Sequence, residues 1–173
     1  AFYGEDGQPV APGEPGEIYA RVPAYADFTY LNHPDKRQRA ERDGLISMGD
    51  VGYLKQGRLY LCDRRSDMVI SAGANIYPAE IVMVLTQCPG VHDCAVFGIP
   101  DDEYGEALAA AVQPLPGATL EPEAVRAWLH QRIAGFKVPR LVTLHAELPR
   151  EDTGKIYKRR LRDPYWAGRV RRV

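Results

Sequence analysis

The chain has 173 residues, of which 45% are hydrophobic and 26% are charged, and its formal net charge is −1. A chain of this length and composition forms one globular domain, or one domain and part of another. The composition excludes a wholly disordered chain, and the near-neutral charge gives no indication of nucleic-acid binding. No apolar run approaches the ~20 residues of a membrane-spanning helix, and no signal peptide is recognisable. Because the first residue is Ala1 and not Met, we expect a processed chain or a fragment.

The three cysteines, Cys62, Cys88 and Cys94, lie within apolar segments. Their odd number and irregular spacing favour small buried side chains in a reducing compartment, and thus a cytoplasmic protein, over a disulfide framework. The histidines lack metal-ligand spacing and no CxxC occurs, so the sequence predicts no metal site.

The first 62 residues are rich in Gly, Pro and charged side chains and predict a β-rich segment. Turns are expected first, in residues 1–16, and a short exposed helix within residues 32–44. Three strands are expected at residues 16–22, Val51–Lys55 and Arg58–Cys62, the last two joined by a tight turn at Gln56-Gly57. So few apolar residues do not suffice for a core, which indicates a larger structure that covers these strands.

After Arg64 the pattern becomes that of a small α+β unit. The expected order over residues 67–162 is β-α-β-β-α-β, a small mixed sheet with both helices on one face. Strands are expected at Asp67–Ser71 and within residues 91–100, 107–115 and 138–146, helices from Pro78 and over Glu121–Ile133, a glycine-containing turn at 72–78, and a short helix at Tyr157–Arg162. The charged join at residues 63–67 is expected to let one body turn against the other.

Single residues give ambiguous signals for function. Lys155 follows Gly154 in the polar loop PREDTGK, where a lysine can reach a phosphate, although the P-loop pattern GxxxxGK[ST] is absent. Asp50 precedes a strand and can accept hydrogen bonds from a ribose diol, and Arg64 can bind a carboxylate or a phosphate. Taken singly, each is more typical of a surface, turn or salt-bridge residue.

Taken together and in order, five segments resemble the adenylate-forming superfamily, and within it the acyl-CoA synthetases and aryl-CoA ligases. The segments are SMGDVGYL, YLCDRRSDMVISAGANIYPAEI, VFGIPDDEYGEA, FKVPRLV and LPREDTGKIYKRRLR. The resemblance covers essentially the whole chain and corresponds to the last third of such an enzyme. It implies that residues 1–63 end the large N-terminal domain in its β-barrel part, that 64–67 form a hinge, and that 68–173 form the mobile C-terminal domain.

The resemblance also implies a reaction in two steps. A small carboxylic acid and ATP form an acyl-adenylate, and the thiol of coenzyme A then displaces AMP. ATP carries Mg²⁺ that is bound mainly by upstream residues. The loop that holds the ATP phosphates and the acyl pocket also lie upstream in such enzymes. We therefore expect this chain to be inactive alone and to need the rest of the enzyme, upstream or as a separate chain.

Several residues receive roles through the resemblance alone. Lys155 matches the adenylation lysine, Asp50 the aspartate that binds the ribose hydroxyls, and Arg64 the arginine beside the ribose and phosphates. Ser66 lies at the hinge, where relatives usually carry Asp or Lys.

A second set matches the loop that enters the active site for thioester formation. Its members are Ser71, Ala72, Gly73 and Asn75, with Ala74 where many relatives have Glu. Gly73 is expected to let the pantetheine arm pass close to the backbone. The basic segment 150–173, with nine Lys or Arg against three Asp or Glu, is expected either to face the nucleotide end of coenzyme A or simply to be solvated.

Two alternatives stay open. One is an adenylation domain that loads a carrier-protein thiol, although such a module would normally continue into a carrier domain. The other is a non-catalytic interaction module, although it would be free to lose Lys155, Asp50 and Gly73, and all three are present. The ending RDPYWAGRVRRV resembles fatty-acyl, steroid or bile-acid CoA ligases, which suggests a role in fatty acid metabolism.

Overall fold

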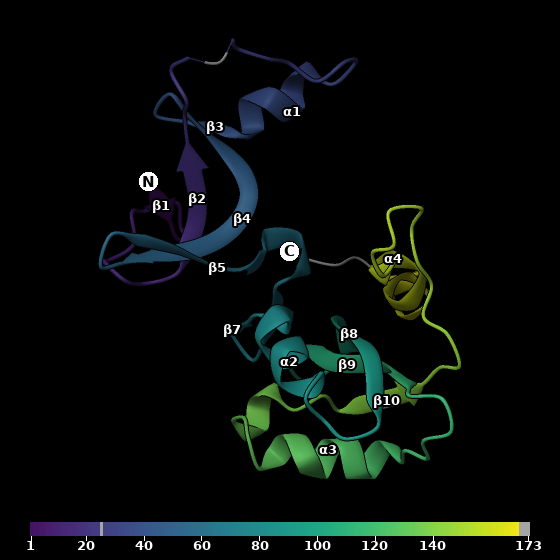
Figure 1. Cartoon of the computed structure of the whole chain (residues 1–173). Helices are drawn as coiled ribbons and strands as arrows, with labels where there is room; N and C mark the ends of the chain where they lie inside the picture. Colours follow the sequence, from purple (N-terminus) through teal and green to yellow (C-terminus); the bar gives the residue numbers. More distant parts are fainter. Residues whose placement is uncertain (25, 170–173) are drawn as a thin grey trace. The chain divides into compact units, whose positions relative to one another are not determined.

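A computed structural model describes residues 1–24 and 26–169, which form two compact units divided between Ser66 and Asp67 (Figure 1). The boundary falls within the charged segment at 63–67. Arg171 and Arg172 of the basic C-terminal segment lie outside the described residues. In the part of the chain that the structure describes, no helix is both long and apolar enough to span a bilayer.

The first unit is an antiparallel sheet with one short helix. The strands are β1 (Phe2–Tyr3), β2 (Gly16–Ala20), β3 (Glu41–Arg42), β4 (Leu45–Lys55) and β5 (Arg58–Arg64), and the helix is α1 (Pro34–Arg39). The order is β1-β2-β4-β3, and β5 also pairs with β4. Gln56 and Gly57 have φ angles of 51° and 73°, so the β4–β5 hairpin closes with the predicted two-residue turn.

The first unit buries little apolar surface. Tyr19 and Val51 are the buried hydrophobic side chains among its described residues, whereas Met48, Leu59 and Leu61 are more than half exposed. The expected shortage of core residues is therefore present in the structure. A sheet with so few covered side chains gains little from burial alone.

The second unit is built on a mixed sheet. Its strands are β6 (Val69–Ser71), β7 (Ala74–Ile76), β8 (Val91–Asp101), β9 (Gly105–Pro114) and β10 (Leu141–Leu144), and its helices are α2 (Pro78–Leu85), α3 (Pro122–His130) and α4 (Lys158–Arg162). The order is β10-β9-β6-β7, and β8 also pairs with β9. Among the described strands of this sheet, only β10 is parallel to its neighbour, so the sheet is mixed as expected.

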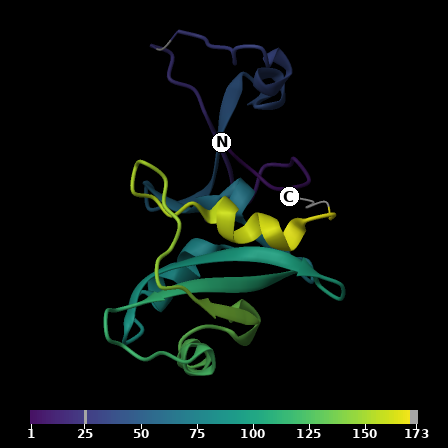
Figure 2. The ribbon, with the colours of Figure 1, turned by 90° about the vertical axis from the view of Figure 1, so that its right-hand side faces the viewer.

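Alternating side chains of β8 and β9 point into two different cores. Val96 and Ala110 belong to the core under α2 and α3, whereas Phe97 and Ala109 belong to the core on the opposite face. That opposite face is covered by the segment that leads into α4, through Leu148, Ile156 and Leu161. Figure 2 shows α4 across one face of the strands, with α3 beyond the other face. The predicted α+β class is confirmed.

Several local expectations differ from the structure: the strand expected from Val51 begins at Leu45, and the strand expected within residues 138–146 is limited to Leu141–Leu144. Residues 74–76 form a strand, β7, and not only a turn, so the unit begins with a hairpin and its order is β-β-α-β-β-α-β-α. The reason is that Ala72 and Gly73, with φ angles of 50° and 79°, complete a two-residue turn that lets Ser71 pair with Ala74. In addition, α3 ends at His130 and not at Ile133, and a 3-10 turn follows at Gly135–Lys137.

The buried thiols agree with the sequence interpretation. Cys88 and Cys94 are buried in the core under α2 and α3, and no disulfide links them. Burial raises the pKa of the Cys94 thiol to about 12, with a smaller contribution from the nearby carboxylate of Asp93. Both behave as small core side chains.

Candidate functional site

In the first unit, Asp50 and Arg64 face each other across β4 and β5. Their Cα positions are paired, and Arg64 Nε lies 2.8 Å from Asp50 Oδ1. Asp50 Oδ2 has no hydrogen-bond partner among the described residues. A β-bulge follows at Gly52, where an added Cβ would lie 2.3 Å from the Tyr60 carbonyl oxygen, so glycine is needed to keep this pairing. The pair therefore presents one free carboxylate oxygen beside a guanidinium group.

Ser66 lies at the end of the first unit, within a 3-10 turn over Arg65–Asp67. The preceding Arg65 forms an ion pair with Glu17 of β2. This contact ties the end of the first unit to its own sheet. Ser66 itself is exposed.

The hairpin between β6 and β7 carries Ser71, Ala72, Gly73 and Asn75. The backbone N–H of Ala72 donates to the carbonyl of Tyr104 at 3.0 Å, and Ser71 pairs with Gly105 at the start of β9. The turn is therefore fixed to the sheet on one side. At Gly73 an added Cβ would have no neighbour within 4 Å, so the tip of the hairpin is open to an approaching molecule.

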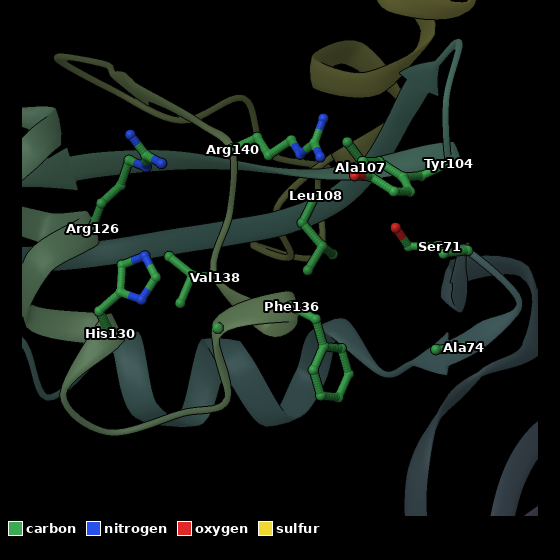
Figure 3. A pocket seen from close by; sticks show the side chains of 12 residues that line it. Ser71, Ala74, Tyr104, Ala107, Leu108, Arg126, His130, Phe136, Val138 and Arg140 are labelled. Atoms are coloured by element: carbon green, nitrogen blue, oxygen red, sulfur yellow. The ribbon is translucent and has the colours of Figure 1, made fainter.

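A cavity of about 470 Å³ lies beside this hairpin (Figure 3). Arg126 and His130 of α3 lie on one side of it, and Ser71 and Tyr104 lie on the other. Phe136, whose surface is 60% exposed, lines it from the 3-10 turn that follows α3. The cavity therefore combines cationic and aromatic side chains, a lining suited to an anionic molecule that also carries a planar group.

Hydrogen bonds hold one rim of this cavity in place. Arg140 lies over the ring of Tyr104, with its guanidinium carbon 4.4 Å from the ring centroid, and donates to Asp101 Oδ2 at 2.8 Å. Asp101 Oδ1 accepts from the backbone N–H groups of Tyr104 and Glu103 at 2.9 and 3.0 Å. The Tyr104 N–H, with smaller contributions from Glu103 and Arg140, lowers the pKa of the Asp101 carboxyl. The carboxylate thus stays ionised and fixes Arg140.

Lys155 lies on an exposed loop of the second unit. The loop is closed at its base by an antiparallel bridge between Arg150 and Ile156 and by a hydrogen bond of 2.8 Å from the Glu151 N–H to the Lys155 carbonyl. The ammonium group of Lys155 makes no side-chain hydrogen bond or ion pair with the residues that the structure describes. Its charge is therefore available to a ligand.

A broad cavity of about 1080 Å³ adjoins this loop. Cationic, acidic and apolar side chains all line it. The residues that line it include Asp67, Asp93, Arg150, Gly154, Lys155 and Lys158. Lys158 Nζ lies 3.0 Å from Asp67 Oδ2, so its charge is compensated, unlike that of Lys155.

Each unit carries part of the sequence-predicted set, and Ser66 lies at the division between the two units. Asp50 and Arg64 form one pair, the hairpin residues lie together beside the first cavity, and Lys155 adjoins the second cavity. Sequence reasoning missed Arg126 and His130, because they come from a segment far from the hairpin and outside the five motifs, and it gave no role to Tyr104, although that residue lies within the motif VFGIPDDEYGEA. Arg140 stood within the motif FKVPRLV, but nothing in the sequence placed it beside Tyr104.

Comparison with known proteins gives the family of the chain. Residues 80–155 match the family model of the AMP-binding enzyme C-terminal domain. The chain is 41% identical over 160 residues to a feruloyl-CoA synthase of an Amycolatopsis species, which covers 92% of the chain and 32% of that protein. It is 37% identical over 169 residues to the fatty acid–[acyl-carrier-protein] ligase ScoC of Streptomyces coeruleorubidus, which covers 97% of the chain and 32% of that protein.

Solved structures of similar proteins have the same fold as this chain. The ATP-bound MatB of Rhodopseudomonas palustris superposes with a TM-score of 0.86 at 33% identity, covering 95% of this chain and 33% of that one. This chain thus spans about a third of the length of the relatives it matches. The chain belongs to the adenylate-forming superfamily and corresponds to the C-terminal part of its members.

Proposed function

We propose that this chain supplies the C-terminal part of an AMP-forming acyl-CoA synthetase. The complete enzyme joins a carboxylic acid to ATP, releasing pyrophosphate, and then transfers the acyl group from AMP to the thiol of coenzyme A. The observation that carries the proposal is Lys155, an uncompensated ammonium group on a loop whose backbone is hydrogen-bonded at its base. Such a group stabilises the negative charge that develops on the α-phosphate during attack by the carboxylate.

In this proposal Asp50 and Arg64 bind the ribose and phosphates of the nucleotide. The free Oδ2 of Asp50 supports this role, because a carboxylate oxygen accepts hydrogen bonds from ribose hydroxyls. Arg64 holds the other oxygen and is two-thirds exposed, so it remains accessible to a phosphate.

We further propose that residues 1–63 end the large N-terminal domain, that residues 64–67 form a hinge around Ser66, and that residues 68–173 form the mobile domain. The division of the structure between Ser66 and Asp67 supports this assignment. The sparse core of the first unit also supports it, because exposed apolar strands need cover from the rest of a large domain.

The second half-reaction is assigned to the hairpin that carries Ser71, Ala72, Gly73 and Asn75. Its open tip at Gly73 leaves room for the pantetheine arm of coenzyme A. The adjacent cavity, with Arg126, Arg140 and Tyr104, supports binding of the nucleotide end, which is both anionic and planar. The Mg²⁺ that accompanies ATP is assigned mainly to the rest of the enzyme.

A carrier-protein thiol is the second candidate acceptor. The 37% identity to an acyl-carrier-protein ligase favours it, and both acceptors end in a phosphopantetheine-type thiol that the same hairpin can admit. The acid is a small carboxylic acid of unassigned structure, with fatty acid metabolism as one setting. The uncrosslinked thiols of Cys88 and Cys94 support a cytoplasmic location.

Lys155→Ala in the complete enzyme tests the proposal. Loss of one charge contact in a water-excluded site is expected to slow ATP–pyrophosphate exchange by about 10²–10³-fold, while transfer from added acyl-adenylate to coenzyme A is largely kept. Lys55→Ala is the control, because Lys55 is exposed at the end of β4 and far along the chain from the loop. Equal loss in both half-reactions of Lys155→Ala, or no loss in either, would refute the assignment.

A further inference from the structure

A lysine that must meet a reacting phosphate depends on the position of its own backbone. The Lys155 side chain has four rotatable bonds and no partner among the described residues, so the loop must supply the positional order. Two backbone hydrogen bonds contribute: the N–H of Gly154 donates to the Glu151 carbonyl at 2.8 Å, and the N–H of Tyr157 donates to the Pro149 carbonyl at 2.7 Å. Gly154 itself has a φ angle of 83°, which turns the chain just before Lys155.

The side chain of Arg150 adds a contact from outside the loop backbone. Its Nη1 donates to the carbonyl oxygen of Gly154 at 2.9 Å, and its Nη2 donates to Asp93 Oδ2 at 2.5 Å. Arg150 therefore joins the residue immediately before Lys155 to strand β8. A guanidinium group is suited to this because its rigid fork holds two acceptors at once.

Asp93 is itself held by the sheet. It pairs with Gln113 of β9, and its Oδ1 accepts from the backbone N–H of Cys94 at 2.8 Å. The neighbouring Cys94 is buried. The carboxylate that receives Arg150 therefore belongs to a strand of the sheet and not to a second loop.

We propose that Arg150 and Asp93 are positioning residues for Lys155: they fix the loop 150–156 on β8 so that the ammonium group reaches the α-phosphate in the adenylation step. The inference rests on the proposed function of Lys155. The two side chains are partly exposed, with exposed fractions of 36% for Arg150 and 29% for Asp93, so this ion pair adds little to the free energy of unfolding. Its effect is instead on geometry, where a displacement of about 1 Å can cost about 10²-fold in rate.

The test is Arg150→Ala in the complete enzyme, assayed in each half-reaction. We expect kcat for ATP–pyrophosphate exchange to fall about 10- to 100-fold with KM for ATP within about threefold, because the loop still forms but is less well placed. Transfer from added acyl-adenylate to coenzyme A is expected to stay within about twofold, which also reports that the variant is folded.

Arg132→Ala is a matched control. Arg132 is exposed on the same unit and also donates from Nη1 to a backbone carbonyl at 2.9 Å, that of Trp128, but it does not line the cavity beside Lys155. It is expected to retain both half-reactions.

Two further variants test the pair more gradually: Arg150→Lys keeps the charge but loses the fork, and Asp93→Asn keeps an acceptor but loses the charge. The rates of ATP–pyrophosphate exchange of both variants are expected to lie between those of the parent and of Arg150→Ala.

A measurement independent of activity is hydrogen exchange on the 173-residue chain. The amides of Glu151 and Gly154 are expected to exchange about tenfold faster in Arg150→Ala and at the parent rate in Arg132→Ala, because the loop opens more often without its anchor. The inference is overturned if Arg150→Ala retains adenylation within about twofold while Lys155→Ala abolishes it, a result that leaves the proposed function intact. It is equally overturned if a folded Arg150→Ala loses both half-reactions alike. Full activity of Lys155→Ala would instead remove the proposed function, and this inference with it.

Discussion

Replacing Gly73 by leucine separates the two half-reactions through the hairpin between β6 and β7. Gly73 has a φ angle of 79°, where a side chain is strained, yet an added Cβ would meet no atom within 4 Å. The cost to folding is therefore that of the backbone alone, about 1–2 kcal/mol for a non-glycine residue in the left-handed region. The leucine side chain would then extend into the open space at the tip of the hairpin.

That open space is where the pantetheine arm passes in the proposed function. We expect Gly73→Leu to leave ATP–pyrophosphate exchange within about threefold and to slow acyl transfer to coenzyme A by about 100-fold or more, since the thiol no longer reaches its attack position. Gly73→Ala carries the same backbone cost with a smaller side chain. It is expected to lose less of the transfer step.

Gly117→Leu is the matched control for this pair. Gly117 lies in the same unit, has the same φ angle of 79°, and also has no atom within 4 Å of an added Cβ. Thermal unfolding is expected to shift by similar amounts in Gly73→Leu and Gly117→Leu, while only the former loses acyl transfer. If Gly73→Leu forms acyl-CoA as fast as Gly117→Leu, the hairpin does not border the thiol and its assignment is wrong.

Two further predictions concern the chain itself. Burial raises the pKa of the Cys94 thiol to about 12, so its thiolate is scarce at pH 8. We expect mass spectrometry to find no alkylation of Cys94 in the folded protein and rapid alkylation in denaturant. Labelling at equal rates in both states would contradict this. The isolated 173-residue chain is expected to lack adenylation activity and to exchange amides at residues 17–22 and 51–62 faster than at residues 67–70, because its first unit buries only Tyr19 and Val51 among its described hydrophobic residues. Equally slow exchange in both regions would show that the first unit is stable by itself.

The elements of the second unit were largely predictable because each has a local cause. Pro78 at the first helical position marks the start of α2, and four-residue spacing marks α3. The alanine-rich segment of β9 gave a strand because small side chains fit a sheet that is covered on both faces. Strand β7 was missed because its three residues, Ala74–Ile76, carry no alternation of their own and pair only through the turn at Ala72-Gly73.

The candidate site was likewise predictable only in part. Lys155, Asp50 and Gly73 were named from the sequence, since each stands within a short motif. Their surroundings were not, because Asp93 lies 57 positions before Arg150 in the chain and Arg140 lies 39 positions after Asp101. Contacts of this kind depend on which strands become neighbours, and no local pattern specifies that.

By itself, the sequence determined the α+β class and the motifs that identify the adenylate-forming superfamily. It did so because helix starts, strand alternation and glycine turns are encoded within a few residues of each other. Only the tertiary structure decided which charges are compensated. Folding brings Asp67 to Lys158 and Asp93 to Arg150, and it leaves the ammonium group of Lys155 without a partner among the described residues. The availability of that charge depends on long-range packing, since only packing determines which carboxylates come within reach.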